Sequence, residues 1–204
     1  MDITDVQICN DALTLCGSPV IASLSDTSRE GKLCNNNYAR SRDYVLREHP
    51  WNCAIKRVQL AKITGGTPSF DFDNSYLLPS DCLKVVRIGS EPEWRQDEYR
   101  VEGRTILSSD EPLKLIYVHQ VTDESLFDHH IAESIAHYLA YRISYALTGS
   151  TTLRTSLLRE YQIVLRKAKS MDAKEDPSAK LHADLFVESR RNIGAERTRM
   201  DILY

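Results

Sequence analysis

Hydrophobic residues near the start of the chain recur at the spacing of a helix. The apolar positions are separated by three or four residues, at Val6, Cys9, Leu13 and Cys16. This spacing is typical of one buried helical face. Thr4 and Gln7 have the T-x-x-Q form of a capping box, while Gly17 and Pro19 supply a stop. We therefore expect a first helix over residues 4–16.

Three further segments carry the same helical period. The second spans residues 26–48 and ends before Pro50, because a residue that precedes proline is disfavoured in the helical region; its stripe is Cys34, Tyr38, Ser41 and Val45. The third spans residues 124–147, with Asp123 as its cap, and its apolar side is Ile131, Ile135, Tyr138 or Leu139, and Arg142 or Ile143. The fourth spans residues 152–174 and repeats at steps of four through Leu153, Leu157, Tyr161, Leu165 and Ala168.

The middle of the chain changes to the alternating period of strands. Residues 51–62 alternate, with Val58 and Leu60 on one side. A hairpin is predicted where two short alternating runs flank a turn at Gly103. We expect one small antiparallel sheet within residues 51–121. The predicted fold class is α+β: a helical bundle of about four long helices with an inserted antiparallel sheet, forming a single domain over residues 1–177, and an extended C-terminal arm over residues 178–204.

Bulk composition narrows the class of protein without naming a function. The chain has 204 residues, 42% hydrophobic and 27% charged, with a net charge of -3. No basic field indicates nucleic-acid binding. The N-terminus lacks the basic and apolar regions of a signal peptide, and no apolar run is long enough for a membrane span. The five cysteines have no C-x-x-C spacing, which favours reduced thiols over a zinc site or a disulfide framework.

Three motifs raise the question of a reaction centre. His129, Glu133 and His137 share one helical face, where imidazole and carboxylate groups could bind a metal, but the pattern is not H-E-x-x-H and a solvated polar face is favoured. Residues 65–68 (Gly-Gly-Thr-Pro) lack the Gly-Lys-Ser/Thr ending of a phosphate loop, which favours a hairpin tip. Asp71, Asp73 and Asn74 lack the spacing of a calcium loop. We expect no catalytic residue, metal or cofactor.

Two tryptophans and the C-terminal arm are candidates for packing and interface roles. Trp51 follows Pro50 and is expected to fill the junction between helix and sheet. Trp94 lies in a polar stretch beside an arginine, which is typical of an interface anchor. Packing of Trp94 onto its own sheet is an equal alternative. The predicted interface residues are Trp94, Arg190, Arg191, Ile202, Leu203 and Tyr204.

Four short stretches of the chain carry a resemblance to a known family. The stretches are residues 8–20 with the Gly17-Ser18-Pro19 exit, 42–54 with Pro50-Trp51, 76–83 with Leu78-Pro79-Ser80-Asp81, and 139–150 ending in Thr148-Gly149-Ser150. Together they span roughly residues 8–150 and keep their order, and this ordered set resembles the tail tubular protein A family, the head-to-tail adaptors of short-tailed phages. The C-terminal arm resembles the family least.

The resemblance implies a structural protein of the virion and not an enzyme. It implies a twelve-fold ring of this chain, bound to the portal protein on one side and the tail nozzle protein on the other. Genomic DNA would pass through the lumen without sequence-specific binding. Such a protein is assembled in the bacterial host cytoplasm and ends in the neck of the virion, with no membrane partner. The net charge of -3 leads us to expect acidic side chains along the lumen, where they would repel the DNA backbone.

Two other classes of function remain as alternatives. A DNA-packaging accessory or DNA-binding protein would need a basic face, which the alternating charges of the sequence do not display. A metal hydrolase would need ligands beyond the His129, Glu133 and His137 face.

Overall fold

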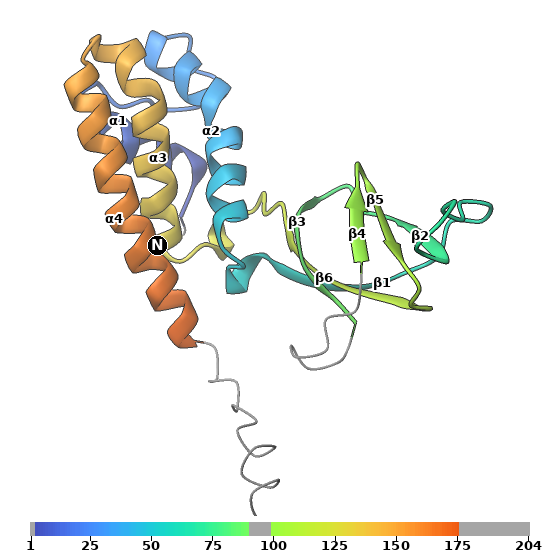
Figure 1. Cartoon of the computed structure of the whole chain (residues 1–204). Helices are drawn as coiled ribbons and strands as arrows, with labels where there is room; N and C mark the ends of the chain where they lie inside the picture. The colour runs from blue at the N-terminus through green and yellow to red at the C-terminus, as the bar shows by residue number, and fades with distance from the viewer. Residues whose placement is uncertain (1–2, 90–98, 176–204) are drawn as a thin grey trace, which may run out of the picture. The chain divides into compact units, whose positions relative to one another are not determined.

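Four α-helices and six strands make up the part of the chain that the computed structural model describes, residues 3–89 and 99–175 (Figure 1). The helices are α1 (Asp5–Leu15), α2 (Arg29–Glu48), α3 (His129–Thr148) and α4 (Thr151–Glu175). The α+β class is confirmed. Residues Met1–Asp172 belong to one compact unit. None of the helices in the described ranges is both long and apolar enough to cross a membrane.

The capping box predicted from the sequence is present at the start of α1. The Thr4 hydroxyl accepts a hydrogen bond from the Gln7 amide at 3.2 Å, and the Gln7 side chain accepts one from the Thr4 amide at 3.1 Å. Gly17 takes a φ of 67°, the left-handed conformation that ends a helix without a Cβ clash. The helix is thus bounded on both sides by the residues that predicted its ends.

Helix α2 begins three residues later than expected. Ser28 is its N-cap and accepts from the Gly31 amide at 3.1 Å. Asp26 instead accepts from the Ser28 amide at 2.9 Å, which places Asp26 in the turn before the cap. The predicted stripe is buried as expected, at Cys34, Tyr38, Ser41 and Val45.

The expected start of the third helix at residue 124 is wrong. Asp123 caps a short 3-10 helix, Glu124–Leu126, through the Ser125 amide at 3.1 Å. The α-helix starts afresh at His129, where Asp128 accepts from the Ile131 amide at 2.7 Å. Two successive acidic caps therefore divide what the sequence pattern read as one helix. On its apolar side, Leu139 and Ile143 are the buried members of the alternatives, beside Ile131 and Ile135.

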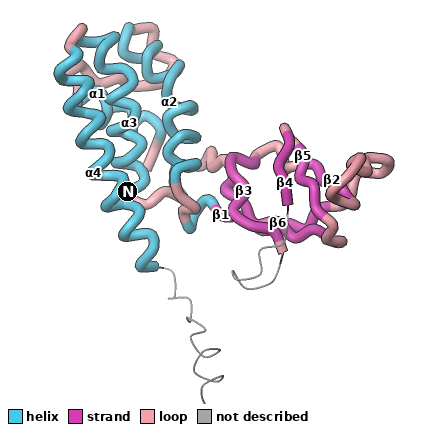
Figure 2. Tube along the Cα trace, in the orientation of Figure 1, coloured by secondary structure: helices cyan, strands magenta, loops and turns pink. Residues whose placement is uncertain are grey.

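The strands form two three-stranded antiparallel sheets, and the prediction of one sheet is wrong (Figure 2). The first has the order β1 (Ile55–Leu60), β6 (Leu113–His119), β3 (Cys82–Ile88). The second has the order β2 (Asn74–Leu77), β5 (Thr105–Ser108), β4 (Tyr99–Glu102). The β4–β5 hairpin is the one predicted. The strand expected over residues 51–62 is shorter, because Asn52–Ala54 form a 3-10 turn first.

The two sheets share a small apolar core. Side chains alternate between the faces of a strand, so Leu113, Leu115 and Tyr117 of β6 point the same way and are buried. They pack with Tyr76 of β2 and Ile106 of β5. Val58 and Leu60 of β1 pack against the same cluster, as the alternation of the sequence predicted.

The larger core lies among the helices, where α3 packs against both α1 and α2. Val118 and Val121, at the end of β6 and beyond it, belong to this core. Trp51 also belongs to it and is fully buried, which confirms its predicted role at the junction of helix and sheet. Its Nε1 donates to the Val45 carbonyl at 3.0 Å.

The predicted interface residues lie outside the described residues. Trp94 falls in residues 90–98, and Arg190, Arg191, Ile202, Leu203 and Tyr204 fall in residues 176–204.

Candidate functional site

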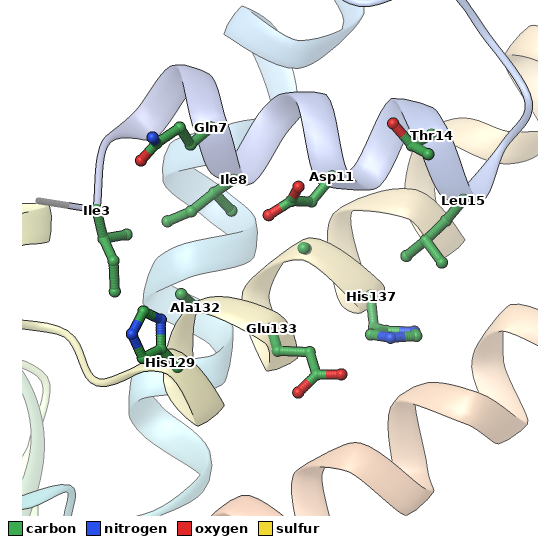
Figure 3. Close-up of a pocket in the computed structure, with 11 residues that line it drawn as sticks. Ile3, Gln7, Ile8, Asp11, Thr14, Leu15, His129, Ala132, Glu133 and His137 are labelled. Atoms are coloured by element: carbon green, nitrogen blue, oxygen red, sulfur yellow. The ribbon is translucent and has the colours of Figure 1, made fainter. Parts of the chain in front are cut away.

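A groove of about 560 Å³ lies between α1 and α3 and contains the polar triplet that the sequence singled out (Figure 3). His129, Glu133 and His137 extend from successive turns of α3. Asp11 lies across the groove from them on α1. The lining also includes apolar side chains from both helices and from the residue before the α1 cap, namely Ile3, Ile8, Leu15, Ala132 and Ala136.

The carboxylate of Asp11 lies in a partly buried and negatively charged environment in this groove. Partial burial raises the pKa of Asp11 above its ordinary value, and the negative charge of Glu133 raises it further. His137 contributes a buried Nδ1 that has no hydrogen-bond partner among the described residues. The groove thus combines an apolar lining with acidic groups that favour a nearby cation.

The positions of the His129, Glu133 and His137 side chains do not favour a metal site. Within residues 3–89 and 99–175, no three His, Cys, Asp or Glu side chains are grouped so that they could hold a metal ion. His129, Glu133 and His137 share the groove but are spread along two turns of α3. What the arrangement can do is accept an apolar side chain of another chain, with Asp11 and Glu133 placed to attract a Lys or Arg head group.

The other two sequence motifs occupy the connection between β1 and β2. Gly66 donates its amide to the Ile63 carbonyl at 3.2 Å, and the Ser75 hydroxyl of β2 donates to the Gly66 carbonyl. Lys62 and Tyr76 form an isolated antiparallel bridge, and the Ile63 amide donates to the Ser75 carbonyl at 2.9 Å, so residues 65–68 lie in the loop between two paired segments, although β1 and β2 themselves belong to different sheets. Asp71 has a φ of 70°, and Asn74 already belongs to β2.

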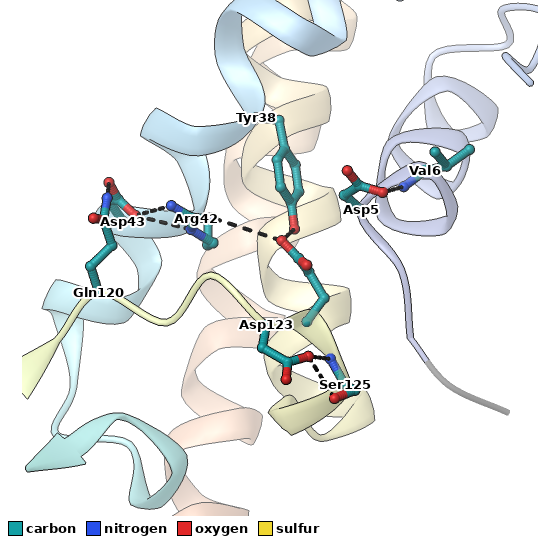
Figure 4. A network of polar contacts seen from close by, with 9 residues as sticks. Asp5, Val6, Tyr38, Arg42, Asp43, Gln120, Asp123 and Ser125 are labelled. Carbon is teal, nitrogen blue, oxygen red and sulfur yellow. Dashed lines mark hydrogen bonds and ion pairs between the residues drawn. The ribbon is translucent and has the colours of Figure 1, made fainter. Parts of the chain in front are cut away.

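A buried polar network connects α2 to the segment between β6 and α3 (Figure 4). Arg42 is only 7% exposed and contacts Asp43 at 3.0 Å and Glu124 at 3.7 Å. The Tyr38 hydroxyl donates to Glu124 at 3.0 Å, and Gln120 Nε2 donates to Asp43 at 2.7 Å. Burial, with the adjacent charge of Glu124, raises the pKa of Tyr38 and keeps its hydroxyl protonated as a donor.

Sequence reasoning missed this network for a physical reason. Its partners are far apart in the chain, and only the packing of the 3-10 helix at residues 124–126 beside α2 brings Glu124 to Tyr38. The one available signal was Arg42 on the face of α2 next to the apolar stripe, where an arginine needs a buried partner.

Comparison with known proteins finds neither a family model that matches this chain nor a curated protein of similar sequence.

Proposed function

We propose that this chain is a ring-forming head-to-tail adaptor of a short-tailed phage, which links the portal to the tail nozzle and leaves a channel for the genome. The observation that carries the proposal is the ordered set of four stretches, within residues 8–150, that resemble the tail tubular protein A family. Order matters because isolated short matches arise by chance, whereas four in sequence indicate a shared arrangement of elements.

The places of these stretches in the fold support the proposal. Each stretch contains a residue that ends a helix or opens a strand. Gly17 and Gly149 take left-handed conformations at the ends of α1 and α3, with φ of 67° and 68°. Trp51 caps the end of α2. Asp81 precedes β3 and accepts from Lys56 Nζ at 2.8 Å and from the Tyr117 hydroxyl at 3.1 Å, so it joins β3 to β1 and β6.

Exposed apolar side chains provide surfaces for contact between copies. The described residues with the most exposed large apolar side chains are Val20, Phe70, Leu77, Leu126, Tyr145 and Ile163, each more than half exposed. A closed ring needs two different surfaces on each chain, which meet side to side. The α1–α3 groove is a concave surface of the kind that an exposed apolar side chain of a neighbouring copy fits.

Binding to a portal tests the proposal directly. We expect the purified full chain to cosediment with the assembled portal of its phage, and not with the dissociated portal subunit, because a ring presents repeated sites that reinforce one another. A chain that stays in the supernatant with the assembled portal contradicts the proposal.

Deletion of residues 190–204 tests the predicted docking role of Arg190, Arg191 and the terminal Ile202-Leu203-Tyr204. We expect the shortened chain to keep the melting temperature of the full chain and to bind the portal more weakly. A variant in which Arg40 and Arg159, both exposed, are replaced by Ala serves as a control for the loss of two positive charges. Unchanged portal binding by the shortened chain would remove the arm from the interface.

A further inference from the structure

The strands of the β1-β6-β3 sheet carry an excess of positive charge. Its three strands include five Lys or Arg residues and no Asp or Glu, namely Lys56, Arg57, Lys84, Arg87 and Lys114. The whole chain has a net charge of -3, so this sheet departs from the average of the molecule. The alternating charges of the sequence do not reveal a basic face, because its members come from three strands that are distant along the chain.

Strand register gathers four of these residues on one face. Arg57 of β1 and Arg87 of β3 are both partners of Ile116, from opposite sides of the central strand β6. Lys84 is the partner of Val118, and Lys114 lies two residues from Ile116, so both share that face. We call Arg57, Lys84, Arg87 and Lys114 the basic sheet face.

The fifth basic residue lies on the opposite face and is neutralised. Lys56 points to the same face of β1 as Val58 and Leu60, because alternate residues of a strand share a face. Val58 and Leu60 pack into the core between the sheets. Lys56 Nζ donates to Asp81 at 2.8 Å. Other lysines of the chain are also paired, since Lys62 contacts Glu111 at 2.7 Å and Lys169 contacts Glu48 at 3.4 Å.

Three members of the basic sheet face are exposed to solvent, and two of these lack such neutralisation. Arg57, Lys84 and Lys114 are exposed. Among the residues that the structure describes, neither Arg57 nor Lys114 forms an ion pair with a carboxylate. A shallow hollow of about 390 Å³ lies between them, lined also by Gln59, Arg87 and Ile116. Arg57 and Lys114, which have no carboxylate partner among the described residues, favour an anionic ligand at this hollow.

We propose that the basic sheet face binds the phosphate backbone of duplex DNA without reading its sequence. Neighbouring strands are about 4.8 Å apart, so Arg57 of β1 and Lys84 of β3 are separated by at least about 10 Å across β6. Charges spread over a flat surface on this scale can contact several phosphates of a duplex, which carries one charge per ~1.7 Å of its axis. Release of the condensed counterions then drives binding.

The composition of the face favours nucleic acid over an acidic protein. Protein interfaces generally have an apolar or aromatic centre, with charges at the rim. Here the charges occupy the centre, and the residues between them are Gln59 and the half-buried Ile116. The inference does not rest on the proposed ring, because it concerns a property of the isolated chain.

Fluorescence anisotropy with the full chain and a labelled duplex of mixed sequence tests the inference. We expect binding at about 50 mM salt that weakens linearly as the logarithm of the salt concentration rises. The variant Arg57→Gln with Lys114→Gln should lose about tenfold or more in affinity, and its salt slope should fall by about 2, because two phosphate contacts are removed. A second duplex of unrelated sequence should bind with the same affinity.

A matched variant controls for net charge. Lys32→Gln with Lys167→Gln removes two exposed positive charges from α2 and α4, and its affinity should stay within about twofold of the unaltered chain. Equal losses in both variants, or absence of binding by the unaltered chain, would overturn the inference. So would competition by polyglutamate as strong as competition by unlabelled DNA at equal charge, since the site would then be one for acidic protein. Circular dichroism of both variants verifies that they are folded.

Discussion

Trp51 lies just past the last turn of α2, where the helix leaves its final carbonyls without partners. The Trp51 indole donates to one of them, the carbonyl of Val45, at 3.0 Å, and the ring itself is fully buried. The side chain therefore acts both as a helix cap and as part of the helical core. A residue that the sequence suggested only as a space-filling group supplies a specific hydrogen bond.

Replacement of Trp51 by Phe separates these two roles. The variant keeps an aromatic ring but loses the donor to Val45 and part of the buried volume, so we expect the free energy of unfolding to fall by about 2 kcal/mol. Urea denaturation measures the loss. Tyr145→Phe, at a residue that is 52% exposed, should change stability by less than about 0.5 kcal/mol. Equal stability of the Trp51 variant and the unaltered chain would contradict this account.

His49 connects the end of α2 to α4. Its Nε2 lies 3.1 Å from Asp172 Oδ2, and the other oxygen of Asp172 accepts from the Asn52 amide at 3.1 Å. Burial lowers the pKa of His49 below its ordinary value of 6.5, although Asp172 acts in the opposite direction. The folded chain therefore takes up this proton at a lower pH than the unfolded chain does.

This difference predicts a loss of stability in acid. As pH falls below about 6.5, the unfolded chain binds a proton that the folded chain still excludes, so the free energy of unfolding decreases until the folded pKa is reached. Urea denaturation between about pH 7.5 and 5 measures the change. The variant His49→Gln should show a smaller decrease over the same range. A His49→Gln variant with the same pH dependence as the unaltered chain would show that other groups cause it.

At the scale of elements, the sequence predicted a helix end best where the capping residue acts on residues close to it in the chain. The capping box at Thr4 and the glycine after α3 act on neighbours within a few residues, so sequence alone identifies them. The break before α3 was missed because residues 123–128 begin with an acidic cap and continue with a helical period, yet the Asp128 side chain provides a second cap five residues after Asp123. Period alone does not distinguish one helix from two consecutive starts.

Gly149 offers a test of an element boundary. It is the cap of α3, with a φ of 68°, and a Cβ built there meets nothing within 4 Å. The cost of Gly149→Ala is therefore backbone strain alone, about 1 kcal/mol in the free energy of unfolding. Gly149→Asn should cost less, because asparagine tolerates the left-handed conformation better. Chemical denaturation of the pair compares them, and an alanine variant as stable as the glycine form would argue against this cap.

The division into two sheets could not be read from the sequence. Alternation identifies strands, but strand pairing depends on how the chain crosses from one sheet to the other. β2 follows β1 in the chain, yet it pairs with β5, and β1 pairs with β6. The register of β3 against β6 shifts between Cys82 and Lys84 and again between Val85 and Arg87. The alternation of the sequence does not predict these shifts either. The basic sheet face depends on this pairing.

At the scale of the whole molecule, the fold class followed from the sequence more readily than the site. Helix, strand and helix regions appear as changes of period, and the structure has them in that order. The triplet His129, Glu133 and His137 was visible as one helical face, but its acidic neighbour Asp11 enters only because α1 packs on α3. Contacts between distant segments create both the groove and the buried network at Arg42.

The proposed ring and the basic sheet face are tested by separate experiments. The net charge of -3 leads us to expect acidic side chains along the lumen, so that DNA slides past the ring without being held. An assembled ring with a basic lumen would contradict this expectation. The variant at Arg57 and Lys114 tests DNA binding by the isolated chain, and its result does not depend on which surface of the ring faces the channel.

The central claim is that the assembled collar, and not the single chain, is the functional unit. Electron cryomicroscopy of the portal mixed with this protein tests the claim most directly. The account predicts a new ring of density stacked on the portal, with about twelve copies of the chain and their exposed apolar side chains at the contacts between neighbours. A portal that remains bare at saturating protein concentration would contradict it.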